Sequence, residues 1–175
     1  MTRPRTLPLA STVIAVACAG LLSITAQAQS QGVGKNEILI GTIQDLSGPV
    51  SAYGKAARNG LQLRIDEINE QGGIHGRKLR LIAEDHGYDP KRAVLAAQKL
   101  VSQDKVFLIA SHIGTPQNNA AMPVQFEKGV INWMPLSAGR EMFDPPHKLK
   151  FASVASYHDT LKMNTPELFK SKGAK

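Results

Sequence analysis

The side chains best suited to chemistry are hydroxyl groups that follow short apolar runs of the sequence. Ser47, Thr115 and Ser137 each lie in a segment of small residues just after such a run. Hydroxyls and the backbone N–H groups of such segments can hold a polar small molecule, and a helix is expected to begin at Thr115, where its dipole favours an anion such as a carboxylate. Pro116 removes one of the backbone donors there. The alternatives are a plain turn at Ser47 and simple capping of the helix by Thr115.

Residues that could catalyse a reaction or hold a metal form no recognisable constellation. Asp85 and His86 are adjacent, but adjacent residues of an extended segment point to opposite faces. The five histidines show no i, i+4 spacing, and Cys18 is the only cysteine. Neither a glycine-rich phosphate loop nor a G-x-S-x-G nucleophile elbow is present. The sequence therefore predicts a protein without catalysis, cofactor or metal; an enzyme on a flavodoxin-like α/β sheet is the alternative.

Alternation of apolar runs with helical segments sets the expected fold. Five runs suit strands buried in a parallel sheet: 38–43, 79–83, 106–110, 130–134 and 151–154. Helices are expected over 54–69, from Pro90 with Asp89 as cap, over 115–128 with a kink or break at Pro123, and over 158–169. Strand–helix alternation implies right-handed crossovers. The predicted fold class is α/β, a doubly wound, Rossmann-like parallel sheet with helices on both faces.

In such a sheet, ligands bind beyond the carboxyl ends of the strands, at the point where the strand order reverses. This rule selects four loops by position alone: 44–53, 85–89, 111–115 and 136–140. Because Ser47, Thr115 and Ser137 all lie in these loops, they are expected to converge on one edge of the sheet. That convergence supports a binding site for a small solute.

The first 28 residues have the organisation of a secretory signal peptide. Arg3 and Arg5 precede an apolar run over 7–24, and Ala26-Gln27-Ala28 provides a small-x-small cleavage site. One alternative is a membrane anchor, but the dense apolar centre is short for a span of about 20 residues. Another is a lipoprotein acylated at Cys18, but Ala15-Val16-Ala17 fits such a site weakly and the apolar run continues past the cysteine. Cleavage after Ala28 would export the protein and leave 29–36 as a short flexible lead-in.

The distribution of charge argues against nucleic acid as a partner. The formal net charge is +7, but two arginines lie in the leader and six lysines lie within 148–175. No basic stripe with interleaved aromatic residues is present. The C-terminal lysines are therefore expected to form a solvated face.

Several separated sequence pieces between residues 37 and 89 occur in the order and spacing of a known family. They are Ile38-Leu39-Ile40-Gly41-Thr42-Ile43, Leu46-Ser47-Gly48-Pro49 with Tyr53-Gly54, Asp66-Glu67-Ile68-Asn69, Gly72-Gly73-Ile74-His75-Gly76-Arg77-Lys78-Leu79, and Glu84-Asp85 with Tyr88-Asp89-Pro90. On these pieces the chain resembles the Leu/Ile/Val-binding-protein family, the periplasmic solute receptors of ABC importers, over residues 37–157. The resemblance implies a type I periplasmic binding fold, a periplasmic location, the membrane permease of an importer as partner, and no catalysis.

Members of this family close two α/β lobes on their solute. By the resemblance, residues 37–157 form the N-terminal lobe and 158–175 form a helix and connector towards a second lobe, so that the sequence ends about where that lobe would begin. We expect a truncated form that binds its solute weakly or undetectably, because pockets normally bury most of a small ligand. A sensory receptor ectodomain is a further alternative, which would need a transmembrane segment after the domain.

The resemblance also implies a ligand-binding set in the first lobe. It consists of an aromatic residue after the first strand and the loops after the third and fourth strands, which here are Tyr53, Ile113-Gly114-Thr115 and Leu136-Ser137-Ala138. Gly114 stands where amino-acid binders of the family often have serine, and Ala138 stands where they often have threonine, so Ser137 or Thr115 would act from one position away. The implied solute is a branched-chain amino acid or a related small carboxylate, aromatic acids included.

Arg140 could bind such a carboxylate, because its guanidinium presents two donors to two oxygens. The alternative is a surface ion pair with Glu141 or Asp144, which follow it closely in the sequence.

Overall fold

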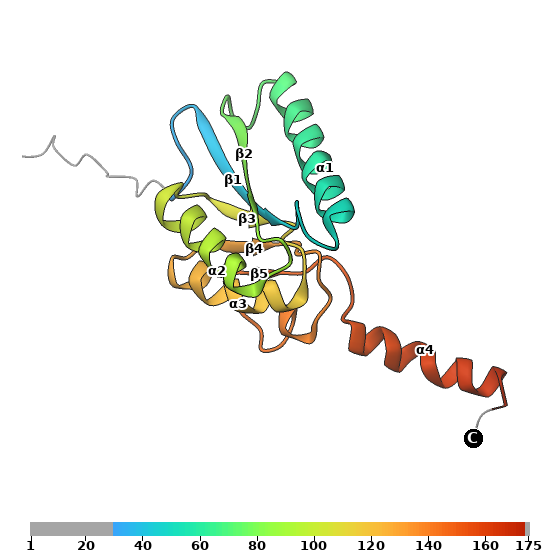
Figure 1. The fold of residues 1–175 in the computed structure, drawn as a ribbon. Helices are drawn as coiled ribbons and strands as arrows, with labels where there is room; N and C mark the ends of the chain where they lie inside the picture. Colours follow the sequence, from blue (N-terminus) through green and yellow to red (C-terminus); the bar gives the residue numbers. More distant parts are fainter. Residues whose placement is uncertain (1–29, 174–175) are drawn as a thin grey trace, which may run out of the picture.

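The strands form one parallel sheet in a computed structural model that describes residues 30–173 (Figure 1). The strand order is β2-β1-β3-β4-β5. The bounds are β1 Glu37–Gln44, β2 Lys78–Asp85, β3 Leu108–Ala110, β4 Ile131–Trp133 and β5 Lys150–Phe151. The predicted leader of residues 1–28, with cleavage after Ala28, lies outside the described residues.

Helices cover both faces of the sheet, as the doubly wound fold predicts (Figure 1). Helix α1 (Ser51–Glu70) packs on β1 and β2, while α2 (Pro90–Gln98) and α3 (Thr115–Glu127) pack against each other on the opposite face. One π-helical turn, η1 (Lys99–Gln103), continues α2, and a short 3-10 turn, η2 (Arg140–Met142), follows β4. Helix α4 (Tyr157–Ser171) extends away from the sheet.

The core lies between the sheet and the pair α2–α3. Its fully buried members come from strands and helices alike: Ile43, Ala96, Ala97, Leu100, Val101, Val106, Ile109, Ala121 and Val130. Asn132 of β4 also faces this layer, since its amide donates to Asn118 of α3 at 3.3 Å. The next residue, Trp133, therefore points to the other face, where it is 39% exposed and its ring lies 5.5 Å from that of Phe151.

Two helix starts test the capping predictions. Asp89 caps α2 as predicted, because its Oδ1 accepts from the N–H of Arg92 at 2.9 Å. The prediction that Thr115 caps α3 is wrong: Gly114 occupies the N-cap position, and Thr115 is the first helical residue. Glycine takes this place because the backbone there has a φ of 95°, a conformation that other residues adopt only with strain.

Other element boundaries differ from the sequence prediction. α1 begins at Ser51 rather than at residue 54, so Tyr53 lies in the first turn of the helix instead of in the preceding loop. α3 runs through Pro123 without a break. β5 covers Lys150–Phe151 rather than 151–154, because within the described residues it pairs with the three-residue strand β4 alone.

Candidate solute-binding edge

The strand order reverses between β1 and β3. These two strands are neighbours, but the chain leaves β1 towards β2 on one side and leaves β3 towards β4 on the other. At the carboxyl ends of these strands an isolated bridge joins Ile113 to Leu136, and the N–H of Ile113 donates to the carbonyl of Ile43. The loops after β1, β3 and β4 are therefore held together at the edge where α/β sheets bind ligands.

Two predicted site residues meet directly at this edge. The hydroxyls of Thr115 and Ser137 lie 2.7 Å apart, joining the first turn of α3 to the loop after β4. Ser137 Oγ also accepts from the N–H of Gly139 at 3.3 Å. The Thr115 hydroxyl is therefore directed towards the neighbouring loop. The two adjacent hydroxyls lie beside a helix N-terminus, an environment that favours a carboxylate. Ser137 is 4% exposed and Thr115 is partly buried.

Gly114 is fixed by space as well as by conformation. A Cβ atom at this position would lie 2.2 Å from the Oε1 atom of Gln117. The N–H of Gly114 donates to the carbonyl of Leu136 at 3.3 Å, which ties the loop after β3 to the loop after β4. A side chain at this position would therefore strain the backbone and require Gln117 to move.

Ser47 is engaged within the protein. Its hydroxyl donates to Asp85 Oδ2 at 2.6 Å, and Arg92 Nη2 lies 3.0 Å from the same oxygen. Partial burial of Asp85 raises the pKa of its carboxyl, but the hydrogen bonds from Ser47, Leu46 and Gly87 and the Arg92 charge outweigh it and hold that pKa well below its usual range. Ser47 thus links the loop after β1 to the end of β2.

Asp45 was not among the predicted site residues, yet it organises the loop after β1. Its side chain is fully buried, with Oδ1 accepting from the N–H of Gly48 at 2.5 Å and Oδ2 from the N–H of Val50 at 2.8 Å. Gly54 packs so closely that a Cβ there would lie 2.0 Å from the carbonyl oxygen of Asp45. The spacing of an acid three residues before the glycine in Asp45-Leu46-Ser47-Gly48 is the signal that could have revealed this turn.

Two histidines are buried side by side under the edge. The rings of His86 and His112 lie 5.5 Å apart. His86 Nδ1 accepts from the N–H of Tyr88 at 2.8 Å, so its Nε2 carries the proton that is donated to the carbonyl of Ile113 at 3.0 Å. Among the described residues neither ring nitrogen of His112 has a hydrogen-bond partner. Burial, with the neighbouring His86 charge, lowers the pKa of His112 to about 3, and burial also lowers the pKa of His86.

The remaining predicted site residues differ in exposure. Tyr53 is 72% and Leu136 44% exposed, whereas Ala138 is buried and its carbonyl accepts from the N–H of Tyr157 at 2.8 Å. Arg140 forms an ion pair with Asp144, with Nη2 and Oδ2 3.1 Å apart. This pairing is the alternative raised for Arg140 from the sequence.

Within residues 30–173, no group of three or more acidic, histidine or cysteine side chains is arranged to hold a metal ion. In the same range no helix is both long and apolar enough to cross a membrane.

Comparison with known families matches residues 37–175 to the family described as "Periplasmic binding protein". A "Leu/Ile/Val-binding protein BraC3" from Rhizobium johnstonii is 38% identical over 109 residues, which is 61% of this chain and 29% of that relative. The chain thus spans less than a third of the length of this relative.

Solved structures show the same similarity. The branched-chain amino acid transporter substrate binding protein LivJ from Streptococcus pneumoniae, in complex with isoleucine, is 32% identical with a TM-score of 0.54, over 56% of this chain and 28% of that one. A possible leucine/isoleucine/valine-binding protein from Rhodopirellula baltica has a TM-score of 0.72 at 22% identity, over 79% of this chain and 37% of that one. The second likeness shows the fold alone.

Proposed function

The chain belongs to the periplasmic binding protein family, within the Leu/Ile/Val-binding proteins, and on this premise we propose that its carboxyl sheet edge forms one wall of a site for a branched-chain amino acid or a related small carboxylate, aromatic acids included. The family consists of binding proteins rather than enzymes, so the prediction of a protein without catalysis is confirmed. The general role of the chain is therefore solute binding, and we propose the class of solute that it binds.

The observation that carries the proposal is the hydroxyl pair of Thr115 and Ser137, 2.7 Å apart at the first turn of α3. A solute carboxylate placed there would accept from these hydroxyls and benefit from the positive end of the helix dipole. Leu136 and Tyr53 supply exposed apolar surface for a branched or aromatic side chain. The backbone of this wall comes from Ile113, Gly114 and Ala138. Ser47 contributes indirectly, because its hydroxyl bonds Asp85 and so links the loop after β1 to the end of β2.

Arg140 has a secondary role in this proposal, as a further side chain that binds the carboxylate of the solute. To reach a solute, its guanidinium would have to leave Asp144, with which it forms an exposed pair. Exposed pairs of this kind contribute only about 0 to 1 kcal/mol, so a solute carboxylate can compete for Arg140.

The proposal extends to location and partner. Export through the leader, with cleavage after Ala28, would deliver the protein to the periplasm, where the family's relatives work with ABC importers. Residues 37–157 would act as one lobe, and the membrane permease of such an importer is the proposed protein partner. No cofactor is needed for this role.

The affinity of the protein for isoleucine tests this proposal, with Ser137→Ala as the informative variant. Because the wall holds the solute from one side, we expect weak binding of isoleucine and weaker binding of an uncharged sugar of similar size. Loss of the Ser137 hydroxyl removes a hydrogen bond to a charged group, so the affinity is expected to fall about tenfold or more. Equilibrium dialysis at high protein concentration measures both.

Ser153→Ala is the matched control, because Ser153 is an exposed serine in the loop after β5. It should bind isoleucine as the unchanged protein does. Equal affinities for isoleucine in all three proteins, or equal binding of the sugar, would show that the solute does not use this wall.

A further inference from the structure

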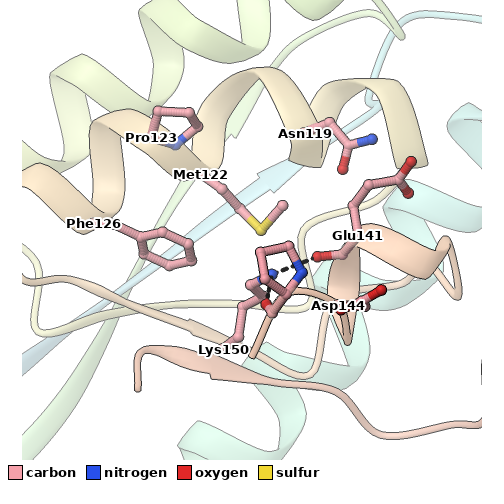
Figure 2. Close-up of a pocket in the computed structure, with 8 residues that line it drawn as sticks. Asn119, Met122, Pro123, Phe126, Glu141, Asp144 and Lys150 are labelled. Atoms are coloured by element: carbon pink, nitrogen blue, oxygen red, sulfur yellow. Dashed lines mark hydrogen bonds between the residues drawn. The ribbon is translucent and has the colours of Figure 1, made fainter. Parts of the chain in front are cut away.

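A cavity of about 300 Å³ lies between α3 and the segment that leads from η2 to β5 (Figure 2). Its apolar wall comes from Met122 and Phe126 of α3 together with Pro145. The ring of His147 stacks on Phe126 with centroids 4.1 Å apart, which fixes the aromatic wall. Neither Thr115 nor Ser137 lines this cavity. The cavity is therefore separate from the solute wall, the name used here for the proposed binding surface around Thr115 and Ser137.

The positive groups at the cavity are already engaged by the protein. Lys150 Nζ donates to the carbonyl of Glu141 at 2.7 Å and to the carbonyl of Pro145 at 2.8 Å (Figure 2). Asp144 at the rim is paired with Arg140. A bound anion would have to displace the two carbonyl contacts of Lys150, so the cavity is not prepared for a carboxylate or phosphate.

Two acceptor groups at the cavity are free. The Oδ1 atom of Asn119 is buried and has no hydrogen-bond partner within residues 30–173. Within the same residues no hydrogen bond or ion pair engages the Glu141 carboxylate, whose residue is bound only through its backbone carbonyl. Asn119 and the Glu141 carboxylate lie at the same end of the cavity (Figure 2). A buried acceptor without a donor costs free energy, and that cost is relieved by a ligand that donates.

From this arrangement we propose that the cavity binds a small organic ammonium ion with an apolar body, independently of the solute wall. The ammonium group donates to Asn119 Oδ1 and to the Glu141 carboxylate, a charge-assisted contact. The apolar body lies against Met122, Phe126 and Pro145. This combination of an apolar surface with a few directed polar groups is typical of small-molecule sites.

Three probes with the same branched apolar body separate the possible chemistries: isopentylammonium, isopentanol and 4-methylpentanoate. We expect saturable binding of isopentylammonium to the protein, with amide shifts in NMR spectra at Asn119, Phe126 and Glu141. The alcohol and the carboxylate should bind at least about tenfold more weakly, because they lack the charged donor.

Glu141→Gln is the matching variant, and it should weaken isopentylammonium binding about tenfold or more. The variant keeps the backbone carbonyl that holds Lys150, so the segment stays in place. Glu127→Gln removes an equal charge from an exposed position at the end of α3 outside the cavity and should leave the affinity unchanged.

The proposal is overturned by equal binding of the three probes, by equal losses in the two glutamate variants, by shifts away from the cavity, or by no saturable binding of the ammonium. Ser137→Ala should leave this binding intact, so a failure here is distinguishable from a failure of the solute wall.

Discussion

At Gly114, both the backbone conformation and the surrounding space favour glycine. Its backbone has a φ of 95°, and a Cβ there would lie 2.2 Å from Gln117 Oε1. Gly114→Ala is therefore expected to lower the free energy of unfolding by about 1–3 kcal/mol, the usual cost of a strained backbone position. Urea unfolding followed by circular dichroism measures this change.

Gly60→Ala provides the opposite expectation with the same chemical change. Gly60 lies within α1, where a Cβ would meet no atom within 4 Å. Alanine in a helix interior is favoured over glycine by about 0.5–1 kcal/mol, so Gly60→Ala should stabilise the protein. If Gly114→Ala did not lower the free energy of unfolding, the backbone at Gly114 would not have the positive φ that requires glycine.

The buried His112 predicts a loss of stability in mild acid. Its pKa falls from 6.5 in the exposed state to about 3 in the folded protein, so the unfolded chain binds the proton first as the pH drops. The stabilising contribution is complete above about pH 6.5 and is lost progressively below it. At about pH 5 the loss from His112 alone is about 2 kcal/mol, and His86 adds in the same direction.

His112→Leu tests this expectation, since it keeps a buried side chain and removes the titrating group. The difference in unfolding free energy between about pH 7.5 and about pH 5 should shrink by about 2 kcal/mol. An unchanged acid sensitivity in His112→Leu would place the titrating group elsewhere.

At the residue scale, the sequence predicted which loops carry the polar residues but not what those residues contact. Thr115 and Ser137 are 22 positions apart, and only the parallel pairing of β3 with β4 brings their hydroxyls together. The buried roles of Asp45 and His112 were missed, because a polar residue next to a strand looks the same in sequence whether it is buried or solvated. The ion pair of Arg140 with Asp144 was foreseen as an alternative, since the two are four residues apart.

At the scale of elements, α2 offers a direct test of capping. Asp89 Oδ1 accepts from the N–H of Arg92 at 2.9 Å, and the same contact lowers the pKa of the Asp89 carboxyl. Asp89→Ala is expected to cost about 0.5–2 kcal/mol of stability. Lys91→Ala, in the same turn, should change stability by less than about 0.5 kcal/mol. Thermal unfolding compares the two variants, and similar midpoints for both would mean that Asp89 is not the cap.

The long elements were predictable because they carry periodic signals over many residues. β1, β2 and α2 were located by apolar runs and by the sequence Asp89-Pro90. The short strands were located but predicted too long: β4 has three residues within the predicted run 130–134, and β5 has two residues and overlaps 151–154 at Phe151. The extent of such short strands depends on their neighbours in the sheet. Thr115-Pro116 looked like a second cap followed by proline, but the positive φ of Gly114 moves the start of α3 by one residue.

At the scale of the whole molecule, the sheet order explains why the solute wall lies where it does. The reversal between β1 and β3 brings the loops after β1, β3 and β4 to one edge. Helix α1 packs on β1 and β2, and α4 extends away from the sheet (Figure 1). The wall is therefore approached from the open side of the sheet edge, and a solute held there is contacted from one direction within the described residues.

The central claim is that a small amino acid binds at this edge, and the most direct test is to map where isoleucine perturbs the backbone amides of the protein by NMR. We predict saturable shifts at Gly114, Thr115, Ser137 and Ala138, with weak affinity because the wall is one-sided. Absence of saturable shifts, or shifts confined to the cavity of Asn119 and Glu141, would contradict the account.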